Sequence, residues 1–192
     1  MKLTPEDLYG LEQYARIRPK FRTRVMEHKA TRRLYIGAHA TLYFEDNLTM
    51  QYQIQEMLRL ERIFEPAGIQ QELDVYNPLI PDGNNWKATF MVEYEDVDER
   101  RAALARLIGI EKQVWIQVAG CNKVYAIANE DLDRNAEDKT AAVHFLRFEF
   151  TPEMVTAIKK GASVRAGIDH LNYREEVGLP PLTRDSLATD LN

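Results

Sequence analysis

The stretch RLYIGAHATLYFED, residues 33–46, sets the expected fold class. Apolar side chains alternate with others through Leu42 and Phe44, the period-two pattern of a strand with one buried face. Gly37 interrupts the pattern, which predicts two strands joined by a short turn. Strands joined in this way pair antiparallel. The stretch therefore indicates an antiparallel sheet near the beginning of the chain.

Further strands and helices extend outward from this stretch. Strands are expected in WKATFMVEYED (86–96), in VWIQVA (114–119) and KVYAIA (123–128) on either side of Gly120-Cys121-Asn122, in residues 141–150, and in SVRAGID (163–169). Helices are expected from Thr4 to about Ala30 with a break or restart at Pro19, from Asn47 to about Phe64, from Asp98 to Leu107, from Thr151 to Gly161, and from Thr183 to about Leu191. Several strands have hairpin-length connections, and the helices lie beside them or near the two ends of the chain. This order favours an α+β fold over a doubly wound one, with a mostly antiparallel sheet of about six or seven strands and flanking helices.

The composition is that of one soluble globular domain covering residues 1–192. Hydrophobic residues make up 45% and charged residues 29% of the 192 positions, which argues against disorder. No apolar run is long enough for a membrane span, and the beginning, MKLTPEDLYG, has acids where a secretory signal has an apolar core. We therefore expect a cytoplasmic protein with no membrane partner.

The single cysteine, Cys121, excludes an internal disulfide and a cysteine-cluster metal site. Its predicted place is the tip of a hairpin, with Lys123 as the only neighbour that would lower a thiol pKa. An incidental exposed cysteine is therefore favoured over a reactive thiol, which the sequence does not exclude.

Charge is distributed unevenly along the chain. The net charge is -5, yet the segment from Arg16 to Arg33 holds eight Lys or Arg and one acid, Glu27. Such a segment either binds an anionic partner or lies against the acidic remainder of its own domain. We favour the second alternative and expect no nucleic-acid binding, because no aromatic platform or known nucleic-acid motif accompanies the charges.

The common enzyme signatures are missing. The chain has no phosphate loop, dinucleotide fingerprint, nucleophile elbow or HExxH zinc motif. Cofactors and oligomeric state stay undetermined, and whether the protein is an enzyme stays open.

The predicted helix NLTMQYQIQEMLRLE, residues 47–61, carries a first candidate site. Met50, Ile54 and Met57 form its apolar stripe, while Glu56 and Arg59 share a neighbouring face at a spacing that allows pairing. A structural polar network, a ligand pocket and a solvated face are the three alternatives. We expect the first, with Arg59 or an arginine of the basic segment, such as Arg32 or Arg33, as the partner of Glu56.

Histidines supply a second candidate site. His144 lies within AVHFLRFEF (142–150) and His170 ends the last expected strand, three residues before Tyr173. We expect these two strands to be neighbours and favour antiparallel over parallel pairing. His144 then lies beside His170, and Glu45 completes a metal-ligand set, with Glu56 as a further candidate. A hydrogen-bonded core histidine is the more common state of such a residue.

Ligand binding supplies another role for these positions. The ligand-binding candidates are Glu56, Arg59, Arg147 and Tyr173, with arginine suited to orienting an anionic ligand. The enzyme alternative uses the glutamate, arginine and histidine side chains for acid–base or metal chemistry on a small anionic substrate.

Blocks along almost the whole chain carry a family resemblance. They are LYFEDNLTMQYQIQEMLRLERI, YNPLIP, KATFMVEYED, AVHFLRFEFT, GIDHLNY and LTRDSLATDL. The chain resembles a bacterial domain-of-unknown-function family that is often encoded beside rubrerythrin and a cysteine-rich iron-sulfur oxidoreductase. Where that family usually has proline after the histidine of the last strand, this sequence has Leu171. The resemblance implies a role in redox or peroxide stress and a protein partner in that pathway, and this implication rests on the neighbouring genes alone.

Two function classes therefore remain. An accessory or binding protein of a redox-stress pathway ranks above a small metal- or ligand-binding enzyme. Convergence of the candidate side chains on one pocket favours the enzyme, and separate, paired side chains favour the binding protein.

Overall fold

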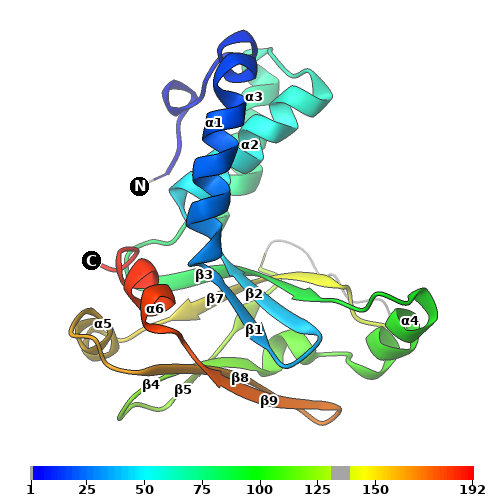
Figure 1. The fold of residues 1–192 in the computed structure, drawn as a ribbon, viewed down its shortest axis with the longest axis vertical. Helices are drawn as coiled ribbons and strands as arrows, with labels where there is room; N and C mark the ends of the chain where they lie inside the picture. The colour runs from blue at the N-terminus through cyan, green and yellow to red at the C-terminus, as the bar shows by residue number, and fades with distance from the viewer. Residues whose placement is uncertain (1, 131–138) are drawn as a thin grey trace.

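Two antiparallel sheets face each other in the computed structural model, which describes residues 2–130 and 139–192, and a helical arm stands on one of them (Figure 1). The expected α+β class with antiparallel pairing is confirmed. The strands, however, form sheets of five and four strands instead of one sheet of about six or seven. Each sheet has one apolar face, and the two faces pack together to form the main core.

The five-stranded sheet has the order β1-β2-β3-β7-β6. Its strands are β1 (Arg33–Ile36), β2 (Ala40–Phe44), β3 (Asn85–Val92), β7 (Val143–Glu149) and β6 (Ile127–Ala128). The predicted turn between β1 and β2 is present, and Gly37 has a φ of 69° there, a conformation that favours glycine. On β3, Trp86 and Phe90 face the core, while Thr89 faces outward.

The four-stranded sheet has the order β5-β4-β8-β9. Its strands are β5 (Lys123–Tyr125), β4 (Val114–Val118), β8 (Val164–His170) and β9 (Tyr173–Gly178). The predicted hairpin of β4 and β5 is confirmed. The strand β9 was not predicted, because it is an edge strand with only two apolar residues, Tyr173 and Val177, facing the core and with most of its side chains exposed.

Three helices lie at the ends of the sandwich (Figure 1). They are α4 (Val97–Arg106), α5 (Pro152–Lys159) and α6 (Pro181–Ala188); η3 (Ile110–Gln113) leads into β4. Trp86 fixes α6 to the five-stranded sheet by donating a hydrogen bond from Nε1 to the carbonyl oxygen of Leu187 (2.9 Å). The expected cap at Thr183 is wrong. The helix begins earlier, at Pro181, whose fixed φ suits a first helical position, so Thr183 lies buried inside it.

The arm consists of α1 (Leu11–Ala30), α2 (Asn47–Glu61) and α3 (Pro66–Tyr76), with the short turns η1 (Pro5–Asp7) and η2 (Asn77–Leu79). It has small cores of its own: Tyr14, Phe21, Val25 and Tyr52 in one, and Ile54, Leu58 and Leu73 in the other. The arm therefore does not depend on the sandwich for all its apolar burial. No helix among residues 2–130 and 139–192 is long and apolar enough to cross a membrane.

The expected break at Pro19 is wrong, because α1 continues through it. A proline inside a helix removes one backbone hydrogen bond and crowds the preceding turn. Phe21 and Val25 after the proline, and Tyr14 before it, are buried against α2, and this packing keeps the helix continuous. The expected helix start at Thr4 yields only the single turn η1.

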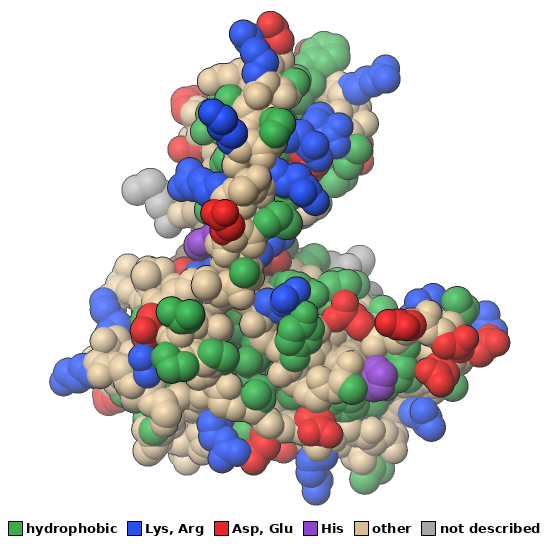
Figure 2. All heavy atoms as spheres, viewed as in Figure 1, with side chains coloured by type: hydrophobic (Ala, Val, Ile, Leu, Met, Phe, Trp, Pro, Cys, Tyr) green, Lys and Arg blue, Asp and Glu red, His purple; other side chains and the backbone are tan. Residues whose placement is uncertain are grey.

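The basic segment lies along α1, where Lys and Arg side chains gather on the arm (Figure 2). Our expectation that it lies against acids of its own domain holds for Arg18 and Arg32, which pair with residues of other elements. Lys20, Arg22 and Arg24 are exposed and form no ion pair within the described part of the chain. The segment is thus neutralised only in part.

Candidate functional site

The site begins where β2 ends and α2 begins. Asp46 is the N-cap of α2: its Oδ1 accepts a hydrogen bond from the amide of Thr49 (2.9 Å), and the Thr49 hydroxyl accepts one from the amide of Asp46 (2.9 Å). This reciprocal capping box satisfies two amides that a helix start leaves unpaired. The carboxylate is thereby held in one orientation at the base of the arm.

Arg32 ties three elements together at this point. Its side chain is 1% exposed, and its guanidinium donates to the carbonyl oxygens of Phe44 (3.2 Å), Glu45 (3.1 Å) and Ser186 (3.3 Å). It also forms an ion pair with Asp190. A planar guanidinium with five donors is suited to such a site, where every N–H needs an acceptor. The result is a fixed junction between α1, β2 and the segment that follows α6.

His28, in the last turn of α1, and Arg32, just after that helix, both face the carboxylate of Asp46. Its Nε2 lies 2.5 Å from Asp46 Oδ2, and Arg32 Nη1 lies 3.6 Å from the same oxygen. Burial acts to raise the pKa of Asp46, but the charge of Arg32, the Thr49 amide and His28 together lower it below its ordinary value. Asp46 therefore stays ionised over the physiological range.

Asp190 behaves in the opposite way. Its side chain is 8% exposed, and burial raises its pKa to about 6, against the attraction of Arg32 and with added repulsion from Asp46. Two carboxylates thus share one buried guanidinium. The proton on Asp190 is exchanged close to neutral pH.

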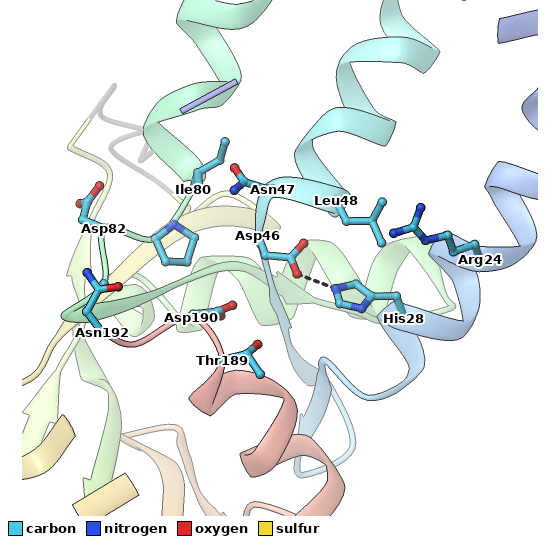
Figure 3. Close-up of a pocket in the computed structure, with 12 residues that line it drawn as sticks. Arg24, His28, Asp46, Asn47, Leu48, Ile80, Asp82, Thr189, Asp190 and Asn192 are labelled. Atoms are coloured by element: carbon cyan, nitrogen blue, oxygen red, sulfur yellow. Dashed lines mark hydrogen bonds and ion pairs between the residues drawn. The ribbon is translucent and has the colours of Figure 1, made fainter. Parts of the chain in front are cut away.

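These groups line an open cavity of about 500 Å³. Figure 3 shows Arg24 and His28 entering from α1, Asp46 and Asn47 from the start of α2, and Thr189 and Asp190 from the end of α6, with the loop that contains Asp82 as the remaining wall. We call this space the junction cavity. The cavity offers the carboxylate of Asp46, which stays ionised, and the carboxyl group of Asp190, which titrates, as hydrogen-bond acceptors. Such groups suit a small polar ligand.

Sequence reasoning missed this site. One signal was present: the acid pair Glu45-Asp46 directly before a helix. His28 lies in the last turn of α1, whereas Arg32 follows the end of that helix, so helical spacing does not place the two side chains together. Asp190 gave no signal, because only the tertiary fold brings the last turn of the chain to the base of α1.

Glu56 is held within the arm, away from the junction cavity. Its carboxylate accepts two hydrogen bonds from Arg18 (both 2.8 Å), one from the hydroxyl of Tyr14 (2.8 Å) and a longer one from Arg59 (3.4 Å). The Arg18 hydrogen bonds are the main reason that its pKa falls to about 2, although burial opposes them. The expected polar network is present, with Arg18 as the main partner. Arg32 is not a partner of Glu56, because it is paired with Asp190 at the base of the arm.

Arg147 and Tyr173 lie in two other places. Arg147 is on the outer face of β7, where it pairs with Glu130 (2.7 Å) and with Glu149. Tyr173, on β9, donates from its hydroxyl to the carbonyl oxygen of Ile36 (2.7 Å) and accepts from the amide of His39 (3.0 Å). The four predicted ligand-binding residues therefore do not share one pocket: Glu56 and Arg59 lie together, and the other two lie apart.

The three predicted metal ligands point in different directions. His144 is fully buried on the inner face of β7, with Nε2 3.0 Å from the carbonyl oxygen of Ala141. Glu45 lies on the outer face of the same sheet, and His170 lies at the end of β8 in the other sheet, with Nε2 3.2 Å from the carbonyl oxygen of Ile108.

The expected pairing of the two histidine strands is wrong. β7 pairs with β3 and β6, whereas β8 pairs with β4 and β9, because α5 carries the chain from one sheet to the other. Among residues 2–130 and 139–192, no three His, Cys, Asp or Glu side chains are grouped to hold a metal ion. Cys121, half-buried beside the main core, is likewise outside such a group.

Comparison with known proteins places the chain in a family. It belongs to the family described as "Protein of unknown function (DUF3501)", which matches residues 2–191. It is also similar to a crystal structure described as a novel protein of unknown function from Burkholderia pseudomallei K96243, with 50% identity over 100% of both chains and a TM-score of 0.95. No curated protein matches. Membership in a family of unknown function is thus established, and neither description names a reaction, ligand or partner.

Proposed function

We propose that this protein binds a small polar ligand with an amino or guanidino group in the junction cavity. The observation that carries the proposal is that Asp46 and Asp190 share the single buried guanidinium of Arg32 beside an open cavity. A cationic group next to Asp190 replaces the proton that the carboxyl otherwise holds. Charge-assisted hydrogen bonds to a carboxylate are among the stronger polar interactions in proteins.

The proton supplies a direct test. Agmatine carries both an amino and a guanidino group, and glutarate is an anionic control of similar length. Isothermal titration near pH 6, repeated in buffers of different ionisation enthalpy, is expected to show agmatine binding with release of a fraction of a proton, because the pKa of Asp190 falls when the cation arrives. Glutarate is expected not to bind.

Matched variants identify the carboxyl group. Asp190→Asn keeps the shape and an acceptor for Arg32 but has no proton to release, so agmatine binding weakens and the proton release disappears. Asp185→Asn removes an acid of α6 that is 61% exposed and pairs with Arg184, and it serves as the control. Equal agmatine affinity in both variants, or no binding to the wild-type protein, contradicts the proposal.

An acid–base enzyme is the second candidate function. The observation in its favour is the His28–Asp46 hydrogen bond of 2.5 Å on the cavity wall, since a carboxylate commonly orients a catalytic histidine. Glu56 and Arg59 lie together in the arm, far from the two histidines of the sandwich, so the structure does not bring the four residues into one acid–base site. If His28→Gln loses substrate turnover but keeps its affinity for the ligand, the protein is an acid–base enzyme.

The pathway is a separate proposal. The cytoplasmic location is proposed from the sequence, which has neither an apolar run for a membrane span nor the pattern of a secretory signal. The only support for a role in redox or peroxide stress, with a protein partner from that pathway, is the resemblance to a family encoded beside rubrerythrin. Co-purification of tagged chain with rubrerythrin from cells exposed to peroxide tests it. Absence of the pair under both normal and peroxide-treated conditions contradicts this partner without affecting the junction cavity.

A further inference from the structure

A second cavity lies on the outer face of the five-stranded sheet, beneath the arm. Its volume is about 370 Å³. Apolar side chains supply much of its lining: Tyr43, Met50, Tyr76, Leu79, Met91 and Phe145. An apolar cavity with a few polar groups is the usual form of a small-molecule site. We call it the sub-arm cavity, and none of its lining residues lines the junction cavity.

Glu45 is the unusual polar group of this cavity. It is 6% exposed, and its Oε1 accepts a hydrogen bond from the hydroxyl of Thr89 (2.7 Å). Thr89 is neutral, and none of the ion pairs within the described residues includes Glu45. A nearly buried carboxyl group is costly unless an opposite charge or several donors compensate for its lost hydration.

Lys29 is the one cation among the described residues that lines the sub-arm cavity, and it does not supply that compensation. Lys29 forms no ion pair with Glu45, and its Nζ lies over the ring of Tyr52, 6.0 Å from the centroid. Within residues 2–130 and 139–192, no cation is paired with the carboxyl group of Glu45, which faces a mostly apolar cavity. A ligand with a positive group at one end and an apolar body complements both features.

We propose that the sub-arm cavity binds an apolar molecule that carries a protonated amine, with the amine on Glu45 and the apolar body against the side chains of Met91 and Phe145. A carboxylate head group is disfavoured there by repulsion from Glu45. An alcohol head group forms a hydrogen bond but no ion pair. The site therefore ranks amine above alcohol above carboxylate for the same alkyl chain.

The chain itself offers a matched control. Glu93, like Glu45, accepts a hydrogen bond from a threonine hydroxyl of the neighbouring strand, here Thr41 Oγ1 (2.6 Å). Glu93, however, is exposed and lies outside the sub-arm cavity. Glu45→Gln and Glu93→Gln therefore remove the same charge from the same kind of hydrogen bond in a buried and an exposed setting.

The test uses decylamine, decanol and decanoate below their aggregation concentrations, with binding followed by ligand-observed NMR. Decylamine is expected to bind the wild-type protein most tightly. Glu45→Gln is expected to weaken decylamine binding about tenfold or more, since an ion pair becomes a neutral hydrogen bond, and to leave decanol binding unchanged. Glu93→Gln is expected to change neither ligand.

Other results overturn the proposal. Two of them are absence of decylamine binding and tighter binding of decanoate than of decylamine. The third is an equal loss of decylamine affinity in Glu45→Gln and Glu93→Gln, because that result indicates a general attraction of the amine to the acidic surface. The order of the three ligands on the wild-type protein needs no variant, so it decides the matter even if Glu45→Gln fails to fold. Met91→Trp, which fills the sub-arm cavity, is expected to exclude both decylamine and decanol.

Discussion

Replacing Asp190 by asparagine is expected to change how the stability of the protein depends on pH. Burial raises the pKa of Asp190 from 3.8 to about 6 in the folded protein. Between these values the folded state holds a proton that the unfolded state has released, so the free energy of unfolding falls as pH rises. A shift of this size corresponds to at most about 3 kcal/mol, of which about 2 kcal/mol is lost between about pH 4.5 and about pH 7.5.

The assay is urea unfolding of the wild-type protein, Asp190→Asn and Asp185→Asn at these two pH values. Asparagine cannot titrate, so the wild-type protein is expected to lose about 2 kcal/mol more than Asp190→Asn over this interval. Asp185→Asn is expected to follow the wild-type protein, because that carboxyl group is largely exposed. The same pH dependence in all three proteins would refute the reasoning that burial of Asp190 outweighs its pairing with Arg32.

Three further substitutions test the surrounding framework. Glu56→Gln is expected to lower the free energy of unfolding at neutral pH by about 1–3 kcal/mol, because the charge-assisted hydrogen bonds from Arg18 weaken. The pKa of Glu56 is lowered to about 2, so this contribution is present above the ordinary value of 4.5 and is lost as pH falls from there toward 2. The same loss of stability between these pH values in the wild-type protein and in Glu56→Gln, measured by urea unfolding, contradicts it. Tyr173→Phe removes both hydrogen bonds to the β1–β2 turn and is expected to cost about 1–3 kcal/mol, whereas a change within error would show that water replaces them. Gly37→Ala places a Cβ 2.6 Å from the Tyr173 hydroxyl at a φ of 69°, so a melting temperature below that of the wild-type protein is expected and an unchanged one argues against this packing.

Local pattern predicted much of the secondary structure. The alternation around Gly37 and around Gly120 is a property of a few adjacent residues, and both hairpins are present. Local pattern was misleading at Pro19, where packing of the arm outweighs the local cost of proline. It was too weak at β9, where only Tyr173 and Val177 are apolar and most side chains are exposed. The division into two sheets was also not predicted, because pairing between distant strands leaves no mark in short-range periodicity.

The candidate sites show the same limit more sharply. Glu56 and Arg59 are three residues apart on one helix, so their proximity followed from helical geometry and is observed. His144, His170 and Glu45 come from three strands, and their expected convergence required a strand pairing that the fold does not contain. Asp190 and Arg32 are separated by 158 positions, so their contact arises from the fold alone.

The most direct test of the proposed function is the titration of the Asp190 carboxyl carbon by ¹³C NMR, with and without agmatine. We expect a pKa of about 6 for Asp190 in the free protein, and agmatine is expected to move it to lower pH because its cation pairs with the carboxylate. A midpoint at the ordinary aspartate value of about 4 in the free protein, or one that agmatine does not move, would contradict it.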